Sequence, residues 1–201
     1  MKIRRFPTEI SATVYVATLI ENLLTNTSNP VLGLSTGSTP VKLYRQLVEF
    51  HRQGLSFAHA VTINLDEYVG ISVDHQQSYH RFMMDHLFSK IDIVSSNTFV
   101  PNGMAANLED ECKRYDAILH AHPIDMQILG IGRNGHIGFN EPDLSLKTHT
   151  HVIRLTEDTV HANRRFFERE SCVPRTYSSD NHGYSINFTS DDYCANGFWQ
   201  K

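Results

Sequence analysis

The chain has 201 residues, a length typical of a single domain. Its hydrophobic share of 40% and its lack of low-complexity runs exclude intrinsic disorder for most of the chain, and no apolar run is long enough to span a membrane. The net charge of -4 argues against a nucleic-acid partner, because binding to nucleic-acid phosphates needs a basic surface, so any phosphate is expected at one local site.

Short apolar segments alternate with longer segments of helical periodicity. The periodicity predicts helices at 8–24, 41–54, 77–90, 107–121 and 156–168, with Gly54 ending the second and Asn107 capping the fourth. Apolar runs predict buried strands at 30–35, 60–66, 124–132 and 150–155, and 97–101 is expected to be extended. This alternation predicts an α/β fold, a Rossmann-like open and mostly parallel sheet with helices on both faces. Ligands of such sheets bind at the carboxyl ends of the strands, so the loops that follow the predicted strands are the candidate ligand-binding segments.

The loop after the first strand consists of small residues that lead into a helix. Backbone N–H groups of such a loop can approach an anion closely, and the helix N-terminus favours negative charge. An ordinary capped strand–helix loop remains the alternative. The expected phosphate-binding residues are Ser35, Thr36, Gly37, Ser38 and Thr39, and Pro40 suits the first helical turn.

Two adjacent carboxylates, Asp66 and Glu67, end the second strand. Neighbouring side chains on a strand point in opposite directions, so one carboxylate is expected to face the crevice as a base while the other braces a neighbouring element. An exposed acidic turn is the simpler alternative.

The loop after the third strand is rich in glycine and contains a G-x-G-x-x-G pattern within 130–142. A dinucleotide-binding loop of this pattern must open a helix, and the sequence HIGFNEP that follows is a poor helix former. The segment is therefore interpreted as a rigid loop that presents His136 and Glu141 to one site.

Cysteine and histidine spacing indicates neither a disulfide framework nor a metal site. Cys112, Cys172 and Cys194 show no CxxC spacing and are expected to be reduced thiols in a cytoplasmic protein, since no signal-peptide pattern is found at the start. His149 and His151 form an HxH pair without a cysteine or carboxylate at ligand spacing, so no metal is predicted.

Four motifs together resemble the glucosamine-6-phosphate deaminase family: GLSTGSTP, NLDEYVG, DHQQSYHRFM and GIGRNGHIGFNEP. The similarity extends over residues 1–177. It implies the interconversion of glucosamine 6-phosphate and water with fructose 6-phosphate and ammonia in amino-sugar catabolism. No metal or organic cofactor is implied, and the partner is a small sugar phosphate. The related 6-phosphogluconolactonases share a GHxA-type loop but lack FNEP, so that hydrolase is the less favoured alternative.

The resemblance also implies roles for individual residues. Asp66 matches the base that takes the C2 proton, and the 35–39 loop matches the phosphate cradle. His136 matches the group that opens the sugar ring, with Glu141 and Asn134 completing the set. Arg165 matches a phosphate-binding arginine. A non-catalytic sugar-phosphate-binding module is the rival interpretation, and a homo-oligomer stays open.

The resemblance stops after residue 177, and 178–201 form a polar segment that we expect to be poorly ordered. The family continues here with a helix, a buried strand and a Gly-x-x-Lys whose lysine binds phosphate, so the final strands are expected to be missing and activity to be low or absent. When the codons for 181–200 are read one nucleotide later, they can encode IMGIASILQVMIIVLMAFGK, which resembles the family's segment. The sequence therefore predicts a frameshift between about Tyr177 and Asn181.

Overall fold

The structure is a computed structural model that describes residues 3–130, 140, 149–154, 174 and 176–179. Its helices are α1 (Glu9–Asn26), α2 (Val41–Arg52), α3 (Tyr79–His86) and α4 (Leu108–Ala121), with 3-10 turns η1 (Phe88–Lys90) and η2 (Ser95–Asn97). Its strands are β1 (Val31–Leu34), β2 (Val61–Asn64), β3 (Asp66–Tyr68), β4 (Thr98–Phe99), β5 (Met126–Gln127), β6 (His151–Arg154) and β7 (Thr176–Ser179). No helix in this part of the chain is long and apolar enough to cross a membrane.

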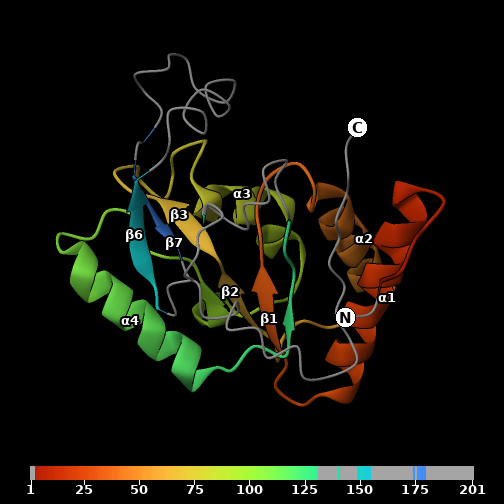
Figure 1. Cartoon of the computed structure of the whole chain (residues 1–201). Coiled ribbons are helices and arrows are strands. Elements are labelled where there is room, and N and C mark those ends of the chain that lie inside the picture. The colour runs from red at the N-terminus through yellow and green to blue at the C-terminus, as the bar shows by residue number, and fades with distance from the viewer. Residues whose placement is uncertain (1–2, 131–139, 141–148, 155–173, 175, 180–201) are drawn as a thin grey trace.

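A parallel sheet with the strand order β4-β2-β1-β5 forms the centre of the molecule (Figure 1). Strands β1 and β2 are buried at every position, as expected for a sheet covered on both faces. Their register pairs Val31 with Val61 and Leu34 with Asn64, so both strands end at the same level. The predicted α/β fold with a parallel sheet is thereby confirmed.

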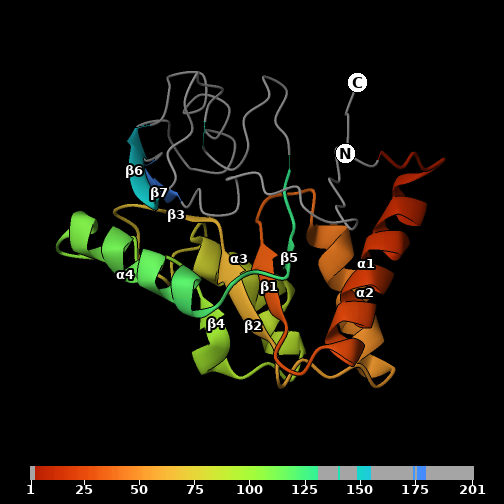
Figure 2. The same cartoon turned by 60° about the horizontal axis from the view of Figure 1, so that its bottom comes forward.

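Helices cover both faces of this sheet, as the two views show (Figures 1 and 2). On one face, Leu32 and Leu34 of β1 join the core cluster that includes residues of α1, α2 and α3. On the other face, Val31 and Ile63 pack with Tyr115 of α4. Alternate residues of a strand point to opposite faces, and this alternation lets one short strand serve two cores.

The assignment of 150–155 to the parallel sheet is wrong. Within that range β6 pairs antiparallel with β7, which also pairs with β3, in a second sheet of order β3-β7-β6. The predicted strand 60–66 is likewise two strands, because the chain leaves the parallel sheet after Asn64 and enters the second sheet at Asp66. The first three residues of β6 are half-buried and the last is exposed, which suits a small antiparallel sheet better than a doubly covered one.

Local signals set the helix ends. The Asn107 side chain accepts hydrogen bonds from two amides of the first turn of α4, which confirms the predicted cap. Helix α2 ends at Arg52, and Gly54 follows with a φ of 112°, a left-handed conformation that favours glycine. The predicted helix 77–90 is shorter, because α3 ends at His86 before η1. The predicted helix 156–168 lies outside the described residues. Of the predicted tail 178–201, the first two residues belong to β7 and residues 180–201 lie outside the described residues.

Candidate functional site

The register of β1 and β2 brings the first two predicted loops together at the carboxyl edge of the sheet. Leu34 lies beside Asn64, and the backbone N–H of Leu65 donates to the Leu34 carbonyl at 3.2 Å. Ser35 and Asp66 follow these residues directly. The loop expected to bind phosphate and the carboxylate expected to act as a base therefore leave the sheet next to each other.

Asp66 is buried, with 5% of its surface exposed, at the first position of β3. The alternative of an exposed acidic turn is therefore wrong. Its negative charge contributes to raising the pKa values of Tyr44, Tyr68 and Tyr79, although burial is the main cause for each of these phenols. Asp66 thus lies among tyrosine hydroxyls that stay protonated, in a place from which bulk water is largely excluded.

Glu67 braces the start of α3. Its carboxylate accepts hydrogen bonds from the backbone N–H groups of Tyr68 at 2.8 Å, Tyr79 at 2.9 Å and His80 at 3.0 Å, and from the Ser78 hydroxyl at 3.1 Å. Burial raises the pKa of this carboxyl, although the four hydrogen bonds act in the opposite direction. The expectation that one of the two carboxylates braces a neighbouring element is confirmed for Glu67, because it accepts hydrogen bonds from the start of α3.

The 35–39 loop leads into the N-terminus of α2. Pro40 precedes the first residue of the helix with a φ of -78° and a ψ of -6°, and its own side chain makes no capping hydrogen bond. The first amides of a helix have no partner within the helix, and such amides can bind a phosphate. Ser35 and Thr36 are half-buried, whereas residues 37–39 are exposed, and Gly37 has a φ of 100° that favours glycine.

Two tyrosines hold the buried end of this loop, and the sequence reasoning missed both. The Tyr44 hydroxyl of α2 donates to the Ser35 carbonyl. The Tyr79 hydroxyl of α3 is hydrogen-bonded to the side chains of Thr36 and Tyr68. For Tyr44 the only signal is a polar hydroxyl on the apolar stripe of a helix, and for Tyr79 it is a position directly after the capping residue Ser78.

The remaining predicted site residues, Asn134, His136, Glu141 and Arg165, lie outside the described residues. The same holds for most of the glycine-rich loop after β5, of which Gly130 and Asn140 are described. The structure therefore brings together Asp66 and the 35–39 loop, and the other predicted roles remain predictions.

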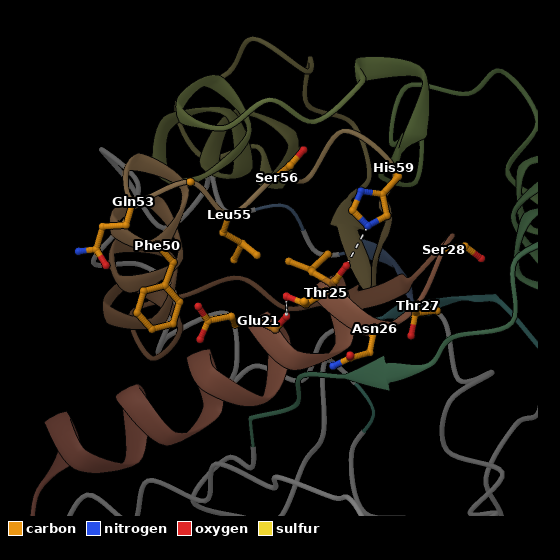
Figure 3. Close-up of a pocket in the computed structure, with 12 residues that line it drawn as sticks. Glu21, Thr25, Asn26, Thr27, Ser28, Phe50, Gln53, Leu55, Ser56 and His59 are labelled. Atoms are coloured by element: carbon orange, nitrogen blue, oxygen red, sulfur yellow. Dashed lines mark hydrogen bonds between the residues drawn. The ribbon is translucent and has the colours of Figure 1, made fainter.

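A cavity of about 850 Å³ lies at the opposite edge of the sheet (Figure 3). Its walls are the C-terminal turns of α1 and α2 and the segments that lead into β1 and β2, including Glu21, Phe50 and His59. The imidazole Nε2 of His59 is hydrogen-bonded at 2.9 Å to the Leu24 carbonyl. Because this cavity opens at the amino ends of the strands, it is separate from the Asp66 site.

The HxH pair serves as a contact between β6 and α4. The Nδ1 atom of His149 lies 3.4 Å from the Asp116 carboxylate, which also accepts a 2.8 Å hydrogen bond from the Thr150 N–H. Within the described ranges, no group of three or more histidine, cysteine, aspartate or glutamate side chains could hold a metal ion.

Comparison with known proteins shows that the chain is similar in sequence to glucosamine-6-phosphate deaminases. A glucosamine-6-phosphate deaminase of Thermoanaerobacter sp. (strain X514) is 51% identical over 161 residues, which are 79% of this chain and 64% of that protein. A glucosamine-6-phosphate deaminase of Clostridium perfringens is 54% identical over 147 residues, 72% of this chain and 61% of that protein. The chain thus spans less than two thirds of the length of these curated relatives.

Solved structures agree with this placement. A monomeric glucosamine-6-phosphate deaminase superposes with a TM-score of 0.87 at 42% identity, over 91% of this chain and 77% of that one. A 6-phosphogluconolactonase from Thermotoga maritima has a TM-score of 0.67 at 21% identity, over 89% of this chain and 76% of that one, and shares the fold alone. The sequence profile of glucosamine-6-phosphate isomerases and 6-phosphogluconolactonases matches residues 8–165, and the chain therefore belongs to that family.

Proposed function

We propose that the protein converts glucosamine 6-phosphate and water into fructose 6-phosphate and ammonia in amino-sugar catabolism. The observation that carries the proposal is the position of a buried carboxylate, Asp66, next to the 35–39 loop and the N-terminus of α2 at the carboxyl end of the sheet. The names of the similar relatives support the same reaction. We further infer a cytoplasmic enzyme whose partner is a small sugar phosphate.

Asp66 is proposed to take the C2 proton of the open-chain sugar as the enolamine forms. Isomerisation needs a carboxylate held beside one face of the substrate and shielded from water, so that the same proton can be delivered to C1. Asp66 meets both conditions, since it is buried and its backbone is fixed in β3 by pairing with Ser179. No metal is needed for this transfer.

Ring opening is assigned to His136, oriented by Glu141 and assisted by Asn134. It requires a proton to move between O1 and O5, which suits an imidazole beside a carboxylate. The dianionic phosphate is assigned to the 35–39 loop and to Arg165, whose guanidinium can bind two oxygens at once. These roles rest on the sequence motifs.

The direct test is production of fructose 6-phosphate and ammonia in equal amounts by the purified full chain supplied with glucosamine 6-phosphate. Asp66→Asn serves as the matched control, because it keeps the size of the side chain and removes the base. Thermal stabilisation by the substrate without product would favour the sugar-phosphate-binding module. Hydrolysis of a 6-phosphogluconolactone without deamination would favour the hydrolase alternative.

A further inference from the structure

The side chain of Tyr79 is hydrogen-bonded both to the 35–39 loop and to β3. It lies at the first position of α3 and is half-buried. Its hydroxyl is hydrogen-bonded to Thr36 in the loop and to Tyr68 in the strand that begins with Asp66, and the Asp66 charge acts on it directly. The rings of Tyr79 and Tyr68 are 5.0 Å apart, so the contact is one of packing as well as hydrogen bonding.

The backbone of Tyr79 is as firmly held as its side chain. The Tyr79 N–H donates to Glu67, which is the residue between Asp66 and Tyr68. The next amide, that of His80, donates to the same carboxylate. The phenol therefore moves with β3 and cannot follow the loop independently.

Tyr44 holds the loop from another side. Its side chain is fully buried in the core beneath α2, and its hydroxyl donates to the backbone carbonyl of Ser35. Tyr44 thus anchors the loop to α2, whereas Tyr79 sets the distance between the loop and β3. The two phenols have different tasks, which makes them separable by mutation.

We propose that Tyr79 is a positioning residue that fixes the spacing between the phosphate loop and the Asp66 carboxylate, and that this spacing selects sugar phosphates by carbon-chain length. This inference rests on the proposed function, because it assumes that phosphate binds at 35–39 and that the carbon to be deprotonated faces Asp66. A phosphate on C6 lies four carbons from C2 in an open-chain hexose. A five-carbon sugar phosphate held by the same loop would leave its C2 out of reach of the carboxylate.

The test compares the affinity of the full chain for glucose 6-phosphate and for ribose 5-phosphate by calorimetry, before and after Tyr79→Phe. The variant keeps the ring packing and removes the hydroxyl. We expect the affinity for glucose 6-phosphate to fall by about tenfold, as for a lost hydrogen bond of about 1.4 kcal/mol, and that for ribose 5-phosphate to fall by less than about threefold. Equal losses for both sugars would overturn the proposal.

Two controls sharpen the comparison. Tyr44→Phe should weaken binding of both sugars and of inorganic phosphate to the same extent. It removes the hydrogen bond that holds the loop to α2 but leaves the spacing between the loop and β3, and hence the sugar chain length that fits between them, unchanged. Tyr15→Phe removes the hydroxyl of a partly buried tyrosine of α1 whose ring contacts Phe6 in a tilted arrangement, and should change neither affinity. Should Tyr79→Phe fail to fold, Tyr68→Phe removes the hydrogen bond between the Tyr79 hydroxyl and β3 and is expected to give the same loss of selectivity.

Binding selectivity and turnover separate this inference from the proposed function. If the chain produces no fructose 6-phosphate but Tyr79→Phe still lowers its preference for the six-carbon sugar, the spacing role is supported and the proposed reaction is contradicted. If the chain produces fructose 6-phosphate and Tyr79→Phe leaves its preference for the six-carbon sugar unchanged, the reaction is supported and the spacing role is overturned.

Discussion

The Glu67 carboxylate accepts a 2.9 Å hydrogen bond from the backbone N–H of Tyr79, and this contact ties β3 to the N-terminus of α3. Helix N-termini attract negative charge, and here that charge comes from the residue next to the proposed base. One of the two adjacent carboxylates, Glu67, thus holds the start of α3, and the other, Asp66, is the proposed base.

Glu67→Gln keeps the number of heavy atoms in the side chain, and we expect it to destabilise the fold. The carboxylate accepts from four donors, and the amide group of glutamine would turn its own N–H groups toward two of them. We expect a loss of about 2–3 kcal/mol in the free energy of unfolding, measured by urea denaturation. Glu109→Gln, at an exposed position of α4, is the matched control and should cost less than about 1 kcal/mol.

The parent chain and the Glu67→Gln variant should also differ in how their free energy of unfolding depends on pH. The pKa of Glu67 lies above its usual value of 4.5, mainly because of burial. A carboxyl with a raised pKa in the folded state contributes stability that is present below the unfolded pKa and lost as the pH rises through the folded pKa. The stability of the parent relative to Glu67→Gln should therefore decrease as the pH rises above 4.5. An increase over that range would show that the hydrogen bonds outweigh burial.

Asp66→Asn should abolish most of the turnover while the fold is kept. Removing a general base typically costs about 10²–10⁴-fold in rate. Because Asp66 is separate from the 35–39 loop, the affinity for inorganic phosphate should stay within about threefold of the parent value, a free-energy change below about 0.7 kcal/mol. The measurements are kcat for fructose 6-phosphate release and calorimetry with phosphate. A variant with parental kcat would remove Asp66 from the reaction.

Two glycines with left-handed backbones allow a matched test of the phosphate loop. Gly37 has a φ of 100° and Gly54 a φ of 112°, and an added Cβ would meet no atom within 4 Å at either position. Gly37→Ala and Gly54→Ala should each cost about 1–2 kcal/mol of stability through the backbone alone. Only Gly37→Ala should also weaken phosphate binding, since Gly54 lies at the opposite edge of the sheet. Equal phosphate affinities in the two variants would place the phosphate elsewhere.

The predicted frameshift is tested at the level of DNA and then of protein. Sequencing of the codons from residue 170 to the end should reveal an insertion or deletion near Tyr177. A chain in which 181–200 are replaced by IMGIASILQVMIIVLMAFGK is expected to unfold at a higher temperature than the parent, because an apolar strand added to a sheet buries more surface. An intact reading frame, with no stabilisation of the replaced chain, would end this hypothesis.

The sequence predicted most elements and the positions of Asp66 and the 35–39 loop after two neighbouring strands, because these features depend on local signals. Periodicity, the cap at Asn107 and the stop at Gly54 act within a few residues, and strand ends locate Asp66 and the 35–39 loop. The break between Asn64 and Asp66 was not predictable in this way. It depends on pairing of β3 with β7, which lies far along the chain.

The role of the tyrosines was also beyond the sequence. Tyr44 and Tyr79 occupy helix positions that look ordinary in a periodic pattern, and their importance comes from what the fold places against their hydroxyls. Hydrogen bonds between elements distant in the chain leave no periodic trace. Sequence patterns therefore indicate the charged groups of a site more readily than the neutral groups that position them.

The strand order β4-β2-β1-β5 has a consequence for the order in which the molecule folds. Strands β1, β2 and β4 follow one another along the chain, whereas β5 pairs with β1 from the other side, and the accompanying bond from the Val31 N–H to Asp125 spans 94 positions. Closing so long a loop carries a larger entropic cost and slows assembly. The phosphate loop thus belongs to the part that forms early, whereas Asp66 is fixed only when β3 pairs with β7. The segment that carries His136 follows a strand that docks late.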